Sequence, residues 1–352
     1  MEYNNSIKLA FISASNSLSM LIMHINYAKK LKSYLNNAKI DLYSAWPDEI
    51  NEEIIKPANV FNSVYLKSVI NHSDNYNLVL RLSYIPKIEM HNSADDFNIK
   101  KIISTYTEFK DSVSTREFFY DNHKQYNPNI FIYSHLNGRN FINSLDIGNL
   151  LDIKKNHYDF SIPISRKSDF LDYCKIGENP FITIRTNGCE NSLRQSAVGK
   201  WFEWNLLVKL IKQYYPNYDV IQVGEVEMDS IEGVKINLTG RASILDLKYI
   251  LGNSTLHIDT ENSFVHFRSI LTTKPSIVLW GPEPMEYFAL ENNINIKKGN
   301  CPHWCRDFSD SWNENCFYKN SPSDCMKSIT AKDVFEKIKE IFVERYEERK
   351  DL

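Results

Sequence analysis

The sequence predicts an α/β fold made of two domains, each with a parallel sheet and crossover helices. Short apolar segments alternate with amphipathic helical segments on both sides of a polar stretch, Asn156–Pro180, that contains Gly and Pro. This alternation is typical of parallel sheets, whose strands are joined by helices. A length of 352 residues also fits two domains better than one. We therefore expect domains over residues 1–165 and 180–330, followed by a C-terminal helix over 331–352.

The first domain is expected to begin with a strand and a helix. Apolar residues form a short run at Ile7–Ile12, and they recur at three- and four-residue spacing over Leu18–Leu35. The segments expected to follow are strands at 40–43, 60–66, 77–82 and 158–164, loops and helices lining a cleft at 85–129, and a helix at 141–151.

The second domain is expected to repeat the alternation. Strands are predicted at Phe181–Ile184 and Asp219–Val223, and helices at Trp201–Tyr215 and Ile244–Leu251. The last helix, from Ala331 onward, carries apolar residues on one face, and we expect it to pack back on the first domain.

The stretch Ser254–Pro282 is the most informative part of the chain. It predicts a strand, a polar turn over residues 259–263, a helix that starts near Phe264, and a second strand over 276–279. Such a turn exposes backbone N–H groups and the positive end of the helix dipole, which suits a phosphate or diphosphate. The alternative is an ordinary capped turn, because Asp, Thr, Asn and Ser are all good N-cap residues.

Composition and hydropathy disfavour several classes of protein. The net charge of −3 and the pI of about 6.3 argue against a dedicated nucleic-acid binder, which usually carries a basic domain. No apolar run is long enough to span a bilayer, and the first residues do not resemble a signal peptide. We expect a cytoplasmic protein, and peripheral contact with the inner membrane stays open.

A candidate phosphate site follows the first strand of the second domain. Arg185, Thr186 and Asn187 lead into a glycine turn, and the cations Arg194 and Lys200 come after it. A guanidinium binds phosphate as a fork, and an ammonium binds it as a point charge. The plainer interpretation of Lys200 is a surface lysine at the start of a helix.

A candidate ribose site follows the next strand. Gly224 and Glu225 come directly after an apolar run, and a carboxylate at such a position can take both hydroxyls of a ribose. The plainer interpretation is an ordinary loop glutamate. A third polar turn, Thr239-Gly240, precedes the helix expected from Ile244.

Four cysteines, Cys301, Cys305, Cys316 and Cys325, fall within one short stretch. In a cytosolic chain such a cluster indicates a metal site more than disulfides, and four thiolates suit one tetrahedral ion. Four reduced, buried cysteines are the alternative. Zinc and iron both stay open, and a structural role is expected because four thiolates leave no open position on the metal.

The order of these motifs resembles glycosyltransferase family 9, the ADP-heptose–lipopolysaccharide heptosyltransferases and their relatives. The motifs that carry the resemblance are Lys200-Trp201, Gln222-Val223-Gly224-Glu225, Leu238-Thr239-Gly240, Asp259-Thr260 through His266, and Leu279-Trp280-Gly281-Pro282. Together they cover roughly Phe181 to Lys337, about half of the chain. The resemblance implies a GT-B fold, in which two Rossmann-like domains face a central cleft. It also implies an inverting transfer without a catalytic metal ion.

The resemblance also implies roles for individual residues. Lys200 and the amides near Thr260–Ser263 would neutralise the donor diphosphate, Glu225 would hold the nucleotide ribose, and Asp259 would contact the donor sugar. The full set expected to bind the nucleotide-sugar donor is Thr186, Asn187, Arg194, Lys200, Gly224, Glu225, Thr260, Glu261, Asn262, Ser263 and His266. Some relatives, notably the autotransporter heptosyltransferases, hold iron on cysteines, which supports the metal interpretation of the cysteine cluster.

Two features depart from the family pattern. Asp259 and His266 are farther apart than in the family, and no Asp or Glu lies between Ser13 and Met23, where relatives carry a candidate general base. His24 is close to that position and could serve instead, although a helix histidine that faces the sheet is the plainer interpretation.

We therefore expect a glycosyltransferase, with Lys200, Asp259 and His24 as candidate catalytic residues. The donor is expected to be ADP-heptose or a related nucleotide sugar, and the acceptor a bacterial surface glycan, glycolipid or glycoprotein. A GT-B transferase with a UDP- or GDP-sugar donor stays open. So does a catalytically silent GT-B scaffold that binds sugars.

Overall fold

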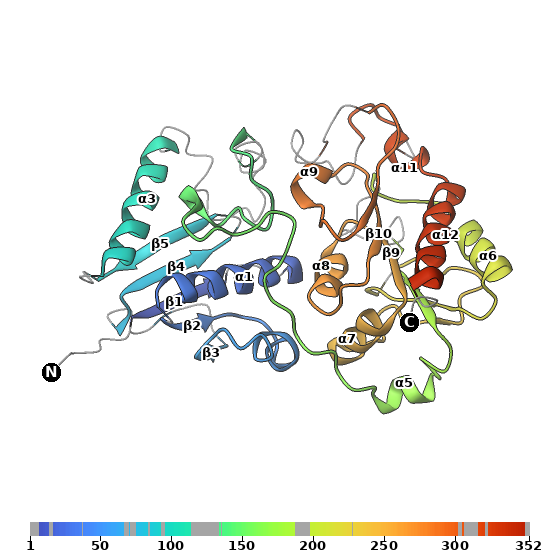
Figure 1. Ribbon diagram of the computed structural model, residues 1–352, viewed down its shortest axis with the longest axis horizontal. Coiled ribbons are helices and arrows are strands. Elements are labelled where there is room, and N and C mark those ends of the chain that lie inside the picture. The colour runs from blue at the N-terminus through green and yellow to red at the C-terminus, as the bar shows by residue number, and fades with distance from the viewer. Residues whose placement is uncertain are drawn as a thin grey trace. The chain divides into compact units, whose positions relative to one another are not determined.

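The structure, a computed structural model, divides the chain into two units, Met1–Pro163 and Ile164–Leu352. Each unit is built around one sheet (Figure 1). The residues that the structure describes are 7–13, 17–36, 38–66, 70, 75–83, 85–92, 96–113, 134, 136–186, 198–226, 228–301, 305, 316–320 and 323–348.

The first unit contains a five-stranded sheet in the order β3-β2-β1-β4-β5. Its strands are β1 (Lys8–Ser13), β2 (Lys39–Tyr43), β3 (Ser63–Tyr65), β4 (Leu78–Leu82) and β5 (Pro86–His91). The first four run parallel, and β5 pairs antiparallel with β4. The strand order therefore reverses between β1 and β4, at the centre of the sheet.

Helix α1 (Leu18–Tyr34) is the central helix of the first unit. Nine consecutive side chains, from Met20 to Ala28, are buried, so the helix is covered on every side. Phe11 of β1 stacks on Tyr27 at a ring distance of 5.9 Å. The other helical segments of this unit are α2 (Asp48–Ile50), the π-helical turn η1 (Asn51–Ile55), α3 (Phe97–Val113) and the 3₁₀ turn η4 (Ile147–Asn149).

The helix expected at 141–151 and the strand expected at 158–164 are wrong. Apart from the 3₁₀ turn η4, both segments are irregular chain that packs on α1. The Ser144 hydroxyl contacts Met23, and the amide of Asp159 donates to Asn26. The apolar spacing is helical, but the buried carboxylate of Asp146 accepts from the amides of Leu151 and Ile153 and bends the chain into a turn. Gly148 then adopts a φ of 76°, which interrupts any helix.

The second unit contains a six-stranded sheet in the order β11-β10-β9-β6-β7-β8. Its strands are β6 (Phe181–Ile184), β7 (Asp219–Gln222), β8 (Ile236–Asn237), β9 (Leu256–Thr260), β10 (Ser276–Leu279) and β11 (Ile294–Ile296). Every adjacent pair is parallel. Counted within the unit, this is the doubly wound order 3-2-1-4-5-6 of nucleotide-binding domains.

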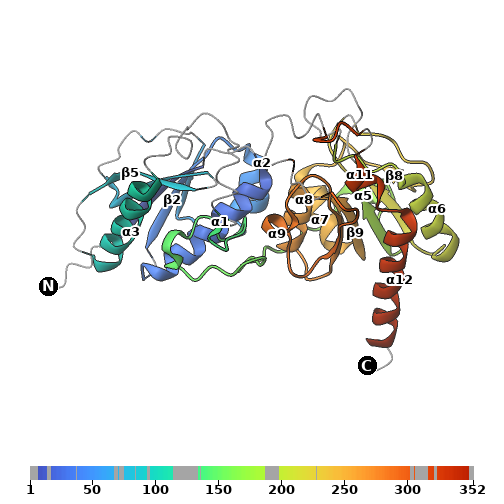
Figure 2. The ribbon, with the colours of Figure 1, turned by 90° about the horizontal axis from the view of Figure 1, so that it is seen from above.

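Helices cover both faces of the second sheet (Figure 1). The helices described in this unit are α5 (Asp169–Tyr173), α6 (Trp204–Tyr214), α7 (Ile244–Asn253), α8 (Ser263–Ser269), α9 (Met285–Phe288), α11 (Asp324–Lys327) and α12 (Ala331–Glu348). Helix α12 packs beside α6 (Figure 2), and Phe342 meets Tyr215 edge-on at 4.6 Å. The expectation that the last helix packs on the first domain is wrong, because its apolar face completes the core of the second unit. Within the described ranges, no helix is both long and apolar enough to cross a bilayer.

Candidate functional site

The strand order of the second sheet reverses between β6 and β9, and ligands of doubly wound sheets bind outside the carboxyl ends of the strands at such a point. Arg185 follows β6 directly, and its amide donates to the carbonyl of Ile258, which extends the β6–β9 ladder by one residue. Asp259 and Thr260 end β9. The topology therefore brings the motifs after β6, β7 and β9 to one edge of the sheet.

Arg185 is the centre of the polar contacts at this edge. Its Nη2 lies 2.9 Å from Oε2 of Glu225, and its Nη1 lies 3.5 Å from Oδ1 of Asp259. The guanidinium also lies 5.4 Å from the centre of the Phe264 ring. Burial by itself lowers the pKa of Arg185, but the carboxylates of Asp259 and Glu225 outweigh it and raise the pKa above its ordinary value.

Asp259 lies beneath the surface of the site. Its side chain is 0% exposed, and its oxygens accept from the amide of Thr260 at 2.7 Å and from Nε2 of His257 at 3.0 Å. Burial lowers the pKa of His257 despite this carboxylate, so the ring is neutral and Nδ1 is an acceptor toward Thr183. The role of Asp259 toward the donor sugar stays a prediction, and its described contacts are with Arg185, His257 and the Thr260 amide.

Lys200 is tied to the loop that follows β7. Its ammonium lies 2.7 Å from the carboxylate of Asp229 and 5.3 Å from the centre of the Phe202 ring. The buried amide of Gln222 holds this loop to the sheet, since it donates to the Asp229 carbonyl at 2.6 Å and to the Thr186 hydroxyl at 3.1 Å. Lys200 is thus attached to the same sheet edge as Thr186.

The backbone around Lys200 is held by the C-terminal part of the chain. The Ser323 hydroxyl donates to the carbonyl of Val198, and the indole of Trp201 donates to the carbonyl of Ile329 at 2.7 Å. These bonds place Lys200 between two anchored positions. Asn187 and Arg194, two expected phosphate ligands, lie outside the described residues.

The turn after β9 contains its own helix cap. Asn262 accepts from the amide of Phe264 at 2.7 Å and donates to the carbonyl of Thr260 at 2.7 Å. The Glu261 carboxylate lies 3.4 Å from Nε2 of His266. Helix α8 has seven residues, from Ser263 to Ser269, so its dipole is short and the full charge of Lys200 matters more to an anion here.

Gly224 allows the chain to turn directly before Glu225. Its φ is 148°, and a Cβ at this position would lie 2.1 Å from the sulfur of Met228. The Gly224 carbonyl accepts from the amide of Gly240 at 2.8 Å, so two of the glycine motifs found in the sequence are joined.

His24 occupies the corresponding reversal point of the first sheet, between the ends of β1 and β4. The Ser83 carbonyl lies 3.2 Å from Nε2, which must carry the proton, and the Ser13 hydroxyl lies 3.2 Å from Nδ1. The ring is fully buried, and burial lowers its pKa to about 4. His24 therefore has the packing of a satisfied core histidine.

The four clustered cysteines are free thiols, with Cys305 and Cys316 buried and Cys301 and Cys325 half-buried. Burial raises the pKa of Cys305 and of Cys325, and neighbouring thiols of the cluster raise it further. Cys305 is thus coupled to Cys301 and Cys316, and Cys325 to Cys301 and Cys305. In the described part of the chain, however, no three His, Cys, Asp or Glu side chains are arranged to hold a metal ion.

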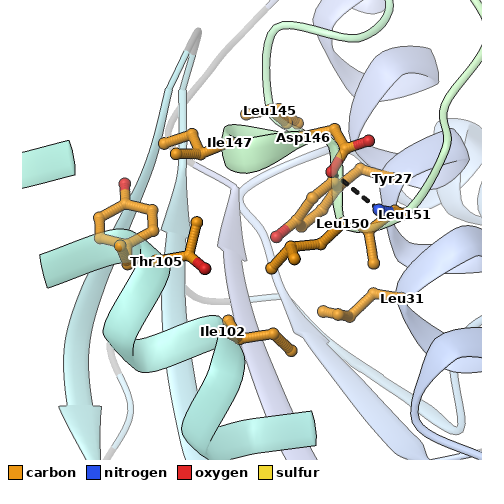
Figure 3. Close-up of a pocket in the computed structure, with 10 residues that line it drawn as sticks. Tyr27, Leu31, Ile102, Thr105, Leu145, Asp146, Ile147, Leu150 and Leu151 are labelled. Atoms are coloured by element: carbon orange, nitrogen blue, oxygen red, sulfur yellow. Dashed lines mark hydrogen bonds between the residues drawn. The ribbon is translucent and has the colours of Figure 1, made fainter. Parts of the chain in front are cut away.

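A small cavity in the first unit lies between α1, α3 and the segment around Asp146 (Figure 3). Its volume of about 20 Å³ is room for a single water molecule. Tyr27 and Ile102 line it, and Asp146 beside it holds the backbone of Leu151. This cavity is far too small for a sugar or a nucleotide.

The geometry of the second-unit site includes residues that the sequence did not single out as ligands. Gln222 and Arg185 stand in the sequence only as parts of motifs, and no sequence pattern indicates Asp229. The sequence signal that could have indicated Gln222 is its amide side chain near the end of an expected strand. Nothing in the sequence pairs Arg185 with Glu225 or Lys200 with Asp229, because these contacts join distant segments.

No protein-family model matches the chain, and no curated protein matches it in sequence. Solved structures do resemble it. Heptosyltransferase II for lipopolysaccharide from Escherichia coli has a TM-score of 0.57 at 12% identity, with 97% of this chain and 100% of that chain covered. A family 9 glycosyltransferase from Veillonella parvula has a TM-score of 0.57 at 12% identity, with 98% and 99% covered.

The iron-containing, dodecameric heptosyltransferase TibC from enterotoxigenic E. coli, solved with ADP-heptose, has a TM-score of 0.61 at 11% identity. The match covers 96% of this chain and 78% of TibC. At these identities the likeness concerns the fold, and it extends over both units rather than over the second alone. This protein therefore has the two-domain GT-B fold, and its structure resembles heptosyltransferases and a glycosyltransferase of family 9.

Proposed function

We propose that this protein is a glycosyltransferase that takes its sugar from a nucleotide-sugar donor bound by the second unit. The observation that carries the proposal is the cluster of polar side chains at the reversal point of the doubly wound sheet, around Arg185, Glu225 and Lys200. The donor that fits the structural neighbours best is ADP-heptose or a close relative, since TibC was solved with ADP-heptose. UDP- and GDP-sugars remain alternatives for this chain.

The expected chemistry is an inverting transfer in which the donor loses a nucleoside diphosphate. The leaving group gains negative charge in the transition state, so cations and backbone amides directed at it lower the barrier. Lys200 would supply a full charge, the turn Thr260–Ser263 would supply amides, and Arg194 would supply a second cation. This arrangement needs no catalytic metal ion.

The acceptor is expected to be a bacterial surface glycan, glycolipid or glycoprotein, as in lipopolysaccharide biosynthesis. Such a role fits a cytoplasmic location at the inner membrane. The general base stays a proposal as well. His24 lies at the carboxyl end of β1, but its buried ring would have to release Ser13 before it could reach an acceptor hydroxyl.

We also propose that Cys301, Cys305, Cys316 and Cys325 hold one structural zinc or iron ion. The thiols gather in one region, although they are not in ligand geometry, and one structural neighbour is described as iron-containing. Thiolate ligands would tie the segment around Cys325 to the rest of the cluster. Ser323, two residues earlier, already bonds the backbone beside Lys200.

A catalytically silent scaffold that binds sugars is the second candidate. It is favoured by one observation: α1 has no acidic residue in its first turn, where a general base would be expected. Binding of a nucleotide sugar without transfer or donor hydrolysis would support the scaffold.

The proposal is tested by binding first and turnover second. A thermal-shift panel of nucleoside diphosphates and nucleotide sugars identifies the donor, because a ligand that binds only the folded state raises the midpoint. Transfer and donor hydrolysis are then measured for wild type and for Lys200→Ala. We expect turnover of Lys200→Ala to fall roughly 100-fold, the effect of losing a charge contact in the transition state.

Two further variants make the result specific. Glu225→Ala is expected to raise KM for the donor while kcat changes little, because a ribose contact contributes equally to the ground and transition states. Lys209→Ala removes an exposed lysine from α6 and should behave as wild type. Wild-type turnover by Lys200→Ala, or a nucleotide bound to the first unit, would refute the assignment of the donor site.

A further inference from the structure

Arg185 contacts three residues at the edge of the second sheet. It pairs with Glu225 after β7 at 2.9 Å and with Asp259 at the end of β9 at 3.5 Å. It also packs over Phe264 in the first turn of α8. Glu225 belongs to one motif expected to bind the donor, and Asp259 and Phe264 belong to another, so one side chain links the two motifs.

The two carboxylates that contact Arg185 differ in their surroundings. The Asp259 side chain is 0% exposed and is bonded on its other sides by His257 and the Thr260 amide. The Glu225 side chain is 60% exposed, and its contact with Arg185 is the one ion pair described for it. Asp259 is thus a buried anchor for the guanidinium, and Glu225 is an exposed carboxylate held by that guanidinium.

We propose that Arg185 is a positioning residue, which holds the Glu225 carboxylate where it accepts hydrogen bonds from the ribose hydroxyls of the donor nucleotide. Asp259 acts indirectly, because it holds the guanidinium of Arg185 in place. The inference rests on the proposed function, in which Glu225 meets the ribose. It adds to that function the residue that determines selectivity for a ribose over a deoxyribose.

The shape of arginine explains why this position requires it. The planar guanidinium presents separate nitrogens to Asp259 and Glu225 while its face packs over Phe264. A lysine keeps the positive charge but has a single nitrogen, so it cannot hold both carboxylates in fixed directions. Arg185→Lys should therefore preserve charge balance and release Glu225.

The test compares the affinities of ADP and 2′-deoxy-ADP by isothermal titration calorimetry. Wild type is expected to prefer ADP about tenfold, because the deoxy ligand loses a hydrogen bond to a charged group. In Arg185→Lys the preference should fall below about twofold, because Glu225 is no longer held in place. The ratio of the two affinities is informative because a general loss of stability or affinity cancels from it.

Two other variants complete the design. Asp259→Asn removes the anion that anchors Arg185 without touching Glu225, and it should reduce the preference in the same way. Asp259→Asn also tests the inference if Arg185→Lys does not fold. Arg166→Lys changes an exposed arginine of the same unit and should keep the preference of wild type.

The possible failures are distinguishable. If both Arg185→Lys and Asp259→Asn keep a tenfold preference, Arg185 does not position Glu225 and the inference is overturned. If wild type binds both nucleotides without preference, Glu225 does not meet the ribose; the inference and the ribose assignment of Glu225 then fail, while nucleotide binding by the chain is retained. If wild type binds no nucleotide, the proposed function fails and the inference fails with it.

Discussion

His24 should make the first unit sensitive to acid. Burial lowers the pKa of its ring to about 4, whereas an unfolded histidine titrates near 6.5. Between these two values the unfolded chain binds a proton that the folded chain excludes. The free energy of unfolding therefore keeps its full value, as far as His24 is concerned, above about pH 6.5, and it falls as the pH drops toward about 4.

The size of the effect follows from the two pKa values. One pKa unit corresponds to about 1.4 kcal/mol, so the full shift is worth roughly 3 kcal/mol. From about pH 7 to about pH 5 the folded state should lose roughly 2 kcal/mol through His24 alone. No discount for solvent screening applies, because the ring is 0% exposed. Burial also lowers the pKa of His257, so acid should destabilise the second unit in the same direction.

The comparison of His24→Gln with wild type isolates this contribution. Glutamine can donate to the Ser83 carbonyl but does not titrate, so the stability gap between the two proteins should shrink by roughly 2 kcal/mol from about pH 7 to about pH 5. Urea unfolding with hydrogen-exchange pulse labelling of α1 peptides reports the first unit separately, which matters because a two-domain chain need not unfold in one step. Met23→Ala, a neighbouring cavity variant, should be destabilised equally at both pH values. An unchanged gap for His24→Gln would refute the reasoning.

Two predictions concern the second unit. Protein purified without chelator should contain about one zinc or iron per chain by elemental analysis. Cys316→Ser should lose the metal, and Cys174→Ser, outside the cluster, should keep it. Metal-free wild type, or disulfides among the four cysteines, would contradict the metal site. Asp229→Asn should bind the donor nucleotide about threefold more tightly by calorimetry, because a carboxylate beside Lys200 repels a diphosphate. The control is Asp219→Asn, which breaks the 2.7 Å pair with Lys235 at the other end of β7. Weaker nucleotide binding by Asp229→Asn would contradict the prediction and show that Asp229 orients Lys200.

The fold was predictable where strands are apolar and long enough to recognise. β1, β6 and β10 are mostly buried apolar residues, β9 alternates buried apolar with buried polar residues, and the helices between the strands have clear apolar spacing. β8 was missed because a two-residue strand has no period to detect. The helix expected at 141–151 failed for a different reason, since a side chain of that segment bonds its own backbone and competes with helix formation.

The candidate site was predictable as a set of positions but not as a set of contacts. Polar turns after parallel strands must meet at one edge of the sheet, so Thr186, Glu225 and the turn after β9 could be grouped from the sequence. Which cation meets which carboxylate depends on side-chain directions across distant segments. Asp259 shows the limit, because its contacts with Arg185 and His257 could not be predicted from its position at a strand end.

The ion pairs of the second unit also bear on how an anionic donor would bind. Lys200 is already paired with Asp229, and Arg185 with Glu225. When a diphosphate reaches Lys200, the lysine therefore exchanges the Asp229 carboxylate for the diphosphate, and no unpaired charge is neutralised. An exchange of this kind contributes less to affinity than a new pair would, but the transition state, in which the leaving group carries more charge, gains more from it. Lys200 should accordingly matter more to kcat than to donor affinity, the reverse of the pattern expected for Glu225.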